Sequence, residues 1–366
     1  MSGGLEGSQA TAEAGWASVM RIALTADPEL PVPPQLYGGI ERIIDLLARE
    51  LSRRGHEVAL FAHPDSATAA ELIPWPGASS RSRTDTLRNA ATLLREVREG
   101  RFDLVHSFSR VAYLLPLLPL PIPKLMSYQR AINRRSIRFG HALSRGSLQF
   151  TALSRWMIDP VADIGTWHLV PNGVSLVAYP FVEDPGPEAP LVFLGRVEEI
   201  KGPHLAIEVA RRAELPLVIA GNVPEEHRGW FEITIAPQLD DKITYIGPVD
   251  DQKKAQLLGS ARALLMPILW QEPFGIVMAE AMASGTPVLG FNRGAVPEVV
   301  EHGVSGFVVE TLGQLVAAVG RLNQLRRSDA RRRVEERYSE LAIADGYIEV
   351  YEQMLKGSVS SRAAHL

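Results

Sequence analysis

Short apolar runs alternate with longer amphipathic segments along most of the chain. From Ile40 to Leu51 the aliphatic residues recur at i, i+3, i+4, i+7 and i+11, which is the spacing of one face of a helix. Short apolar runs between such helices are typical of strands that are buried on both faces of a parallel sheet. The alternation therefore predicts βαβ units and a doubly wound α/β fold.

The alternation falls into two halves, separated by a Pro-, Gly- and acid-rich stretch at residues 183–190 that is typical of a linker. In the first half we expect strands at residues 21–26, 58–62, 104–107, 124–128, 150–153 and 167–170. In the second half we expect strands at residues 191–194, 217–220, 243–246, 263–267, 288–291 and 306–309. Two Rossmann-like domains facing across a central cleft follow, with ligands at the carboxyl ends of the strands.

The domain boundaries follow from this division. We expect a disordered tail at 1–19, Rossmann-like domains at 20–180 and 181–340, a C-terminal helix at 341–356 that returns towards the first domain, and a disordered tail at 357–366. The region from 311 to 356 is helical and rich in arginine. We interpret those arginines as a solvated helix surface.

Composition narrows the class of protein. Of the 366 residues, 46% are hydrophobic and 22% are charged, as in a soluble globular protein. The net charge of −4 leaves no basic field for nucleic acid, and the absence of cysteine excludes disulfides and thiolate metal sites. The longest apolar run, Val111 to Pro123, is broken by prolines, and the start lacks the features of a signal peptide. We therefore expect a cytoplasmic protein.

The segment from Trp270 to Pro287 is the richest in candidate chemistry. Gly275 stands at the start of a predicted helix, whose first N–H groups and partial positive charge suit an anion such as a diphosphate. Glu272 lies just outside that helix end, and Glu280 lies about one and a half turns inside it and leans back towards it. The alternative interpretation is a capping carboxylate at Glu272 and a surface Glu280.

Two further elements fall at carboxyl ends of predicted strands. Arg196 ends one strand and Lys201, one of only six lysines, follows just before the next helix, so both can neutralise a diphosphate that faces the cleft. Gly38 and Gly39 allow the loop after the first strand to approach a ligand closely. The alternative interpretation of Arg196 and Lys201 is a surface charge pair, and that of Gly38 and Gly39 is a simple turn. No G-x-G occurs in the chain, which argues against a nicotinamide dinucleotide site.

These elements together resemble the retaining glycosyltransferases of family 4, which have the GT-B fold and an E-x7-E motif. The resemblance spans about residues 20–355. The matching pieces are Tyr37–Arg42, Pro171–Val174, Gly195–Gly202, Tyr245–Val249, Glu272–Glu280 and Gly294–Glu298.

The resemblance implies a role for each piece. The second domain would bind a nucleotide-diphosphate sugar and the first its acceptor, with retention of the anomeric configuration and without a metal or other cofactor. The implied nucleotide-sugar contacts are Gly38, Gly39, Val249, Phe274, Gly275, Ile276 and Glu280, and the implied catalytic residues are Glu272, Arg196 and Lys201. The chain has no Asp-x-Asp, which agrees with a metal-independent enzyme.

The chain departs from the family pattern at one point. Family members often carry a histidine where Gln129 stands here, and that residue lines the sugar site. Gln129 and the neighbouring Arg130 are therefore predicted pocket residues, and His106 is either a substitute for the missing histidine or a satisfied structural histidine. The basic residues from Arg130 to Arg145 suit an anionic acceptor or a membrane surface, or are simply solvated.

The predicted function is transfer of a sugar, most often from a UDP-sugar in such families, to a hydroxyl of a glycolipid, a glycan or a secondary metabolite. The alternatives are a GT-B sugar-nucleotide epimerase, which needs no acceptor, and a non-catalytic nucleotide-sugar binding protein. The expected partners are the donor and the acceptor, without nucleic acid. The protein is expected to be a monomer or a homodimer.

Overall fold

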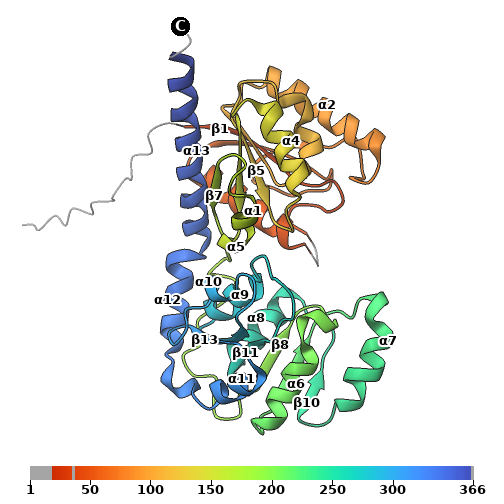
Figure 1. Cartoon of the computed structure of the whole chain (residues 1–366), viewed down its shortest axis with the longest axis vertical. Coiled ribbons are helices and arrows are strands. Elements are labelled where there is room, and N and C mark those ends of the chain that lie inside the picture. Colours follow the sequence, from red (N-terminus) through yellow and green to blue (C-terminus); the bar gives the residue numbers. More distant parts are fainter. Residues whose placement is uncertain (1–18, 35–37, 364–366) are drawn as a thin grey trace, which may run out of the picture.

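A computed structural model describes residues 19–34 and 38–363 of the chain. The tail that the sequence predicts at 1–19 therefore lies outside the described residues except for Val19, and so does Tyr37 of the Tyr37–Arg42 piece. Figure 1 shows two lobes stacked along the long axis of the molecule, with the C-terminal helix beside the upper lobe.

The first lobe is built on a parallel sheet with strand order β3-β2-β1-β4-β5-β6-β7. Its strands are β1 (Arg21–Thr25), β2 (Glu57–Ala62), β3 (Glu71–Pro74), β4 (Leu104–Ser107), β5 (Lys124–Tyr128), β6 (Leu148–Ala152) and β7 (Trp167–Leu169). Its helices are α1 (Gly39–Arg53), α2 (Arg83–Glu99), α3 (Val111–Leu114), α4 (Arg134–Ser144) and α5 (Arg155–Ile158). Strand β3 was not predicted from the sequence, because this edge strand is only partly buried and shows no apolar run.

The second lobe repeats the plan with strand order β10-β9-β8-β11-β12-β13. Its strands are β8 (Leu191–Leu194), β9 (Leu217–Ala220), β10 (Ile243–Tyr245), β11 (Ala263–Met266), β12 (Val288–Phe291) and β13 (Gly306–Val309). Its helices are α6 (Pro203–Arg212), α7 (Arg228–Trp230), α8 (Asp251–Ser260), α9 (Ile276–Ala283), α10 (Val296–Val299), α11 (Leu312–Val319) and α12 (Arg327–Arg337). Both orders reverse next to their first strand, which is where doubly wound sheets bind ligands. The predicted fold class is confirmed.

Helix α13 (Glu340–Ala363) leaves the second lobe and packs on α1 of the first. Tyr347, Ile348 and Tyr351 are buried there in the core that contains Ile44 and Leu47 of α1. The predicted helix end at 356 is wrong, because α13 continues to Ala363. In the part of the chain that the structure describes, no helix has the length and apolar character to span a bilayer.

The arginines of α12 correct a second prediction. Arg327 donates to the carbonyls of Val182, Gly259 and Ala261, and Arg331 and Arg333 likewise donate to backbone carbonyls. Burial lowers the pKa of Arg327 to about 10. A solvated surface is thus the wrong interpretation for these three side chains, which bind backbone carbonyls of other segments.

His106 takes the structural one of its two predicted roles. Its side chain is fully buried under α13, where Nδ1 lies 2.7 Å from the Tyr351 hydroxyl and Nε2 lies 2.7 Å from the Ser127 hydroxyl. Burial lowers the pKa of His106 from its ordinary value of 6.5 to about 3. The neutral imidazole therefore helps to dock α13 on the sheet, away from the cleft.

This burial makes the stability of the protein sensitive to acid. Between about pH 6.5 and pH 3, His106 binds a proton in the unfolded chain but stays neutral in the folded chain. The free energy of unfolding therefore falls as the pH falls. As the pH falls through this range, we expect the free energy of unfolding of wild type to drop by about 1.4 kcal/mol per pH unit relative to that of His106→Gln, whose side chain cannot titrate. Urea unfolding from pH 4 to pH 7 measures the free energy of unfolding of both proteins. A difference between the two free energies that stays constant across that range would contradict the prediction.

Candidate active site

A cavity of about 700 Å³ opens between the two lobes at the carboxyl ends of their strands. The first lobe contributes Gly38, Gly39 and Arg42, and the second contributes β8, the loops after it and α9. Nine of the residues proposed from the sequence line this cavity, namely Gly38, Gly39, Arg196, Lys201, Val249, Glu272, Gly275, Ile276 and Glu280. Residues that lie far apart in the sequence therefore surround one space.

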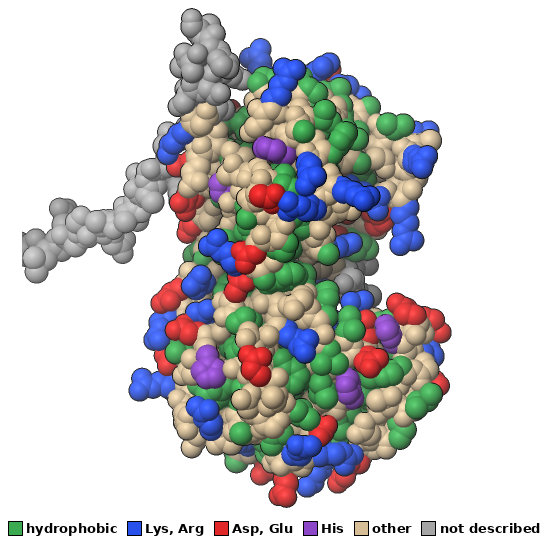
Figure 2. Space-filling view, in the orientation of Figure 1, with side chains coloured by type: hydrophobic (Ala, Val, Ile, Leu, Met, Phe, Trp, Pro, Cys, Tyr) green, Lys and Arg blue, Asp and Glu red, His purple; other side chains and the backbone are tan. Residues whose placement is uncertain are grey.

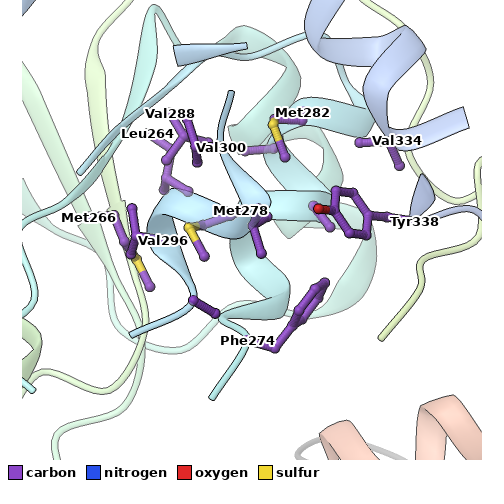
Figure 3. Close-up of a cluster of buried hydrophobic side chains, with 14 of the residues drawn as sticks. Leu264, Met266, Phe274, Met278, Met282, Val288, Val296, Val300, Val334 and Tyr338 are labelled. Carbon is purple, nitrogen blue, oxygen red and sulfur yellow. The ribbon is translucent and has the colours of Figure 1, made fainter. Parts of the chain in front are cut away.

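Helix α9 presents its N-terminus to the cavity because Gly275 turns the chain into it. Gly275 has a φ of +74°, and a Cβ there would lie 2.9 Å from Cε of Met278 and 3.2 Å from Cγ of Glu272. Glycine is therefore the residue that fits this turn. Figure 3 shows Met278 and Met282 pointing from α9 into a buried cluster with Met266 and Val296, which fixes the helix behind the site. The N–H of Met278 donates to the Gly275 carbonyl over 2.9 Å, so the N–H groups of Ile276 and Val277, which precede it at the helix end, are the ones suited to an anion.

Glu272 is held at one oxygen by a cation and an indole. Lys201 Nζ donates to Oε2 over 2.6 Å, and Trp270 Nε1 donates to the same oxygen over 3.1 Å. The Lys201 ammonium also lies 4.6 Å from the centre of the Trp270 ring. We call Lys201, Trp270 and Glu272 the Glu272 clamp. It leaves Oε1 of Glu272 as the oxygen that can meet a ligand hydroxyl.

Glu280 is held in the same manner. Lys254 Nζ and the Tyr179 hydroxyl each donate to Oε1 over 2.6 Å, and the Lys254 ammonium lies 5.6 Å from the Tyr179 ring centre. We call Lys254, Tyr179 and Glu280 the Glu280 clamp. Lys254 also lies 3.4 Å from Asp251, which pairs with Arg42 of the first lobe over 2.6 Å. The chain of ion pairs that begins at Glu280 therefore ends on the first lobe, across the cleft.

Three clamp residues, Tyr179, Lys254 and Trp270, were not predicted from the sequence, whereas Lys201 was. Lys254 and Tyr179 lie outside every motif, and the scarcity of lysine is the one sequence signal that could have drawn attention to Lys254. Trp270 begins the segment that contains Glu272, but nothing in the pattern assigned it a role. The close packing of Tyr179, Lys254 and Glu280 is a property of the tertiary structure.

Arg196 is paired with a carboxylate as well. Its Nη2 lies 2.9 Å from Oε1 of Glu198, an ion pair without the alignment of a hydrogen bond, and Glu198 is buried at 3% exposed. His227 Nε2 lies 3.4 Å from the other oxygen of Glu198. Both Arg196 and Lys201 thus carry a protein counter-ion that an anionic ligand would have to displace or share.

Four proposed residues do not line this cavity. Phe274 turns its ring into the core against Tyr338, with ring centres 5.6 Å apart, so only its backbone borders the helix end. His106 lies under α13, as described above. Gln129 follows β5, and both polar atoms of its amide are buried without a hydrogen-bond partner among the described residues. Arg130 is exposed on the first lobe, where it faces Asp27 and Glu41.

Those two carboxyl groups are unusual for their surroundings. Burial, and secondly the charge of Glu29, raises the pKa of Asp27 to about 6, while Arg130 and Arg110 oppose the rise. Burial likewise raises the pKa of Glu41. The cleft-facing end of the first sheet therefore combines weakly acidic carboxyl groups with an exposed guanidinium.

Contacts between the lobes position the loop of Glu272. Glu298 accepts hydrogen bonds from the N–H groups of Arg155 and Trp156, over 2.7 and 3.2 Å, so it caps α5 of the other lobe. Trp156 Nε1 donates to the carbonyl of Glu272 over 3.0 Å, and Ser154 Oγ donates to that of Pro273 over 2.8 Å. Within residues 19–34 and 38–363, no group of three His, Asp or Glu side chains is arranged to hold a metal ion.

Comparison with known proteins extends this picture. A family model described as "Glycosyl transferases group 1" matches residues 182–340, and one described as "Glycosyltransferase Family 4" matches residues 37–177. The phosphatidyl-myo-inositol mannosyltransferase of Mycolicibacterium smegmatis is 28% identical, over 91% of this chain and 94% of the relative.

Two solved structures share the fold. AviGT4, a glycosyltransferase involved in avilamycin A biosynthesis, is 25% identical with a TM-score of 0.72, over 92% of this chain and 98% of that one. Anabaena HepE, solved in complex with UDP and glucose, is 18% identical with a TM-score of 0.69, over 91% of this chain and 100% of that one. The chain therefore belongs to the family 4 glycosyltransferases, and its two Rossmann-like lobes form the GT-B fold.

Proposed function

We propose that this glycosyltransferase moves a sugar from a UDP-sugar to an acceptor hydroxyl of a glycolipid, a glycan or a secondary metabolite, with retention of configuration and without a metal. The observation that carries the proposal is the cavity that gathers Arg196, Lys201, the start of α9 and the two clamped carboxylates, Glu272 and Glu280. The complex of HepE with UDP and glucose, and the name of the mycobacterial relative, support a nucleotide-sugar donor and a glycolipid acceptor.

The chemistry of the cavity suits each part of such a donor. Arg196, Lys201 and the N–H groups at the start of α9 would hold the diphosphate, and the Oε2 atom of Glu280 would accept from the ribose hydroxyls. Glu272, through Oε1, and the backbone around Phe274 would hold the sugar, and Val249 would border the base. Lys201 pairs with Glu272 and would also reach the phosphates, so it would link the sugar contact to the leaving group.

The reaction then needs charge stabilisation more than proton transfer by the protein. The bond from the anomeric carbon to the diphosphate oxygen breaks, and the acceptor oxygen bonds to that carbon from the same face. The acceptor proton passes to the departing diphosphate. Fixed positive charge on Arg196, Lys201 and α9 stabilises the leaving group with little reorganisation.

A thermal-shift screen with UDP, GDP, ADP and TDP tests the donor. A ligand at 100 times its Kd stabilises the folded protein by about 2.7 kcal/mol, and we expect the largest shift with UDP, unchanged by EDTA. No shift with any of the four would overturn the proposal. A shift that EDTA abolishes would overturn metal independence alone.

Turnover assays separate the alternatives. Release of UDP that requires an acceptor is expected of a transferase, whereas conversion of the donor without an acceptor would favour an epimerase. Binding without any slow hydrolysis of the donor would favour a non-catalytic protein. Contact with a membrane through the basic first lobe stays a prediction; Figure 2 shows Lys and Arg side chains over part of that lobe, and Arg134 is already paired with Asp163.

A further inference from the structure

The segment that connects the two lobes contributes a side chain to the Glu280 clamp. Tyr179 lies between β7 and β8, is 6% exposed, and its carbonyl accepts a hydrogen bond from Arg331 over 2.9 Å. Tyr179 borders the neighbouring inter-lobe cavity, and its hydroxyl donates to Glu280. A buried tyrosine from the connecting segment thus reaches a carboxylate that lines the donor cavity.

The clamp leaves the two oxygens of Glu280 with different partners. Both the Tyr179 hydroxyl and Lys254 Nζ meet Oε1, and in the described part of the chain Oε2 accepts no hydrogen bond. Two donors on one oxygen fix the rotation of the carboxylate, whereas Lys254 alone could follow it through its flexible side chain. Oε2 is thereby oriented before any ligand arrives.

We propose that the hydroxyl of Tyr179 is a positioning group for the nucleotide ribose, because with Lys254 it holds Oε1 of Glu280 and leaves Oε2 for the ribose hydroxyls. This inference rests on the proposed function and adds a residue to it. Burial and the adjacent charge of Glu280 raise the pKa of Tyr179 above its ordinary value, so the hydroxyl remains a donor at any working pH.

The role predicts an effect that depends on the ribose of the ligand. Tyr179→Phe keeps the ring and the backbone contact but frees the carboxylate, which must then be ordered when the ribose binds. We expect UDP to bind about 10-fold more weakly to this variant, which corresponds to about 1.4 kcal/mol. 2′,3′-Dideoxyuridine diphosphate lacks the ribose hydroxyls and makes no contact with Oε2. Its affinity should therefore fall by less than about twofold in the same variant.

Calorimetric titration of wild type, Tyr179→Phe and Tyr338→Phe with both nucleotides measures the coupling. Tyr338 is the matched control, because its buried hydroxyl donates to the carbonyl of Glu298 over 3.1 Å and its loss removes a hydrogen bond outside the clamp. We expect Tyr338→Phe to bind both nucleotides like wild type. In turnover, Tyr179→Phe should raise the donor KM with little change in kcat, because the ribose is held alike before and during the reaction.

The outcomes separate this inference from the proposed function. Equal losses of both nucleotides, or no loss at all, in Tyr179→Phe would overturn the positioning role while leaving the donor site intact. If wild type binds GDP rather than UDP in the screen, the titrations use GDP and its dideoxy form. The difference between the losses of these two nucleotides in Tyr179→Phe then tests the positioning role. Failure of wild type to bind any nucleoside diphosphate would overturn both.

Discussion

Lys201→Ala is expected to lower kcat/KM by at least about 10²-fold, which is about 2.7 kcal/mol of transition-state stabilisation. Two losses combine in this variant. The leaving diphosphate loses a cation, and Glu272, only 8% exposed, loses the partner that lies 2.6 Å from its Oε2. Trp270 remains as a neutral donor to that oxygen, but it cannot balance its charge.

The same pairing predicts how a second substitution combines with the first. Glu272→Ala alone should also cost at least about 10²-fold in kcat/KM, because the sugar contact is lost. Since the two side chains share one ion pair, the double variant should lose less than the product of the single losses. Steady-state kinetics of the three variants measures this coupling.

Lys242→Ala is the matched control, because this lysine is exposed ahead of β10 and outside the cavity, and its loss should leave kcat/KM unchanged. Thermal unfolding of each variant separates a folding defect from a loss of chemistry. Near-normal turnover in Lys201→Ala or Glu272→Ala would count against the assigned roles.

Gly294→Ala should impair the enzyme although Gly294 touches no ligand in the proposed complex. Its φ is +54°, and a Cβ there would lie 2.3 Å from the backbone N of Glu272 and 2.5 Å from its carbonyl oxygen. Because backbone atoms cannot move aside as a flexible side chain can, the loop of Glu272 must shift. A displacement of about 1 Å at a catalytic group can cost about 10²-fold, and we expect a loss of kcat/KM of that size.

Gly303→Ala is a control for the backbone strain alone. Gly303 has a φ of +78°, also in the left-handed region, but a Cβ there would meet nothing within 4 Å. Both variants should lose about 1–2 kcal/mol of stability from the strained backbone, but only Gly294→Ala should lose turnover. Wild-type kinetics in a folded Gly294→Ala protein would show that the position of the Glu272 loop does not limit the reaction.

The strands show how far local pattern reaches. Runs such as Leu191–Leu194 and Val288–Phe291 match the observed strands, because a strand buried on both faces needs an apolar residue at every position. Strand β3 escaped notice because its edge position relaxes that requirement. The arginines of α12 were misread because a helix pattern does not reveal which carbonyls of other elements lie within reach of a guanidinium.

The sequence by itself determined the two doubly wound lobes, since these depend on periodicity within single elements. The resemblance of its motifs indicated the family and the residues between Glu272 and Glu280 that line the cavity. Only the tertiary structure decided that Tyr179 and Lys254 hold Glu280, that Trp270 and Lys201 hold Glu272, and that His106 supports α13 instead of the sugar site. Most of these contacts join residues of different elements, and their distances depend on how the lobes and loops pack.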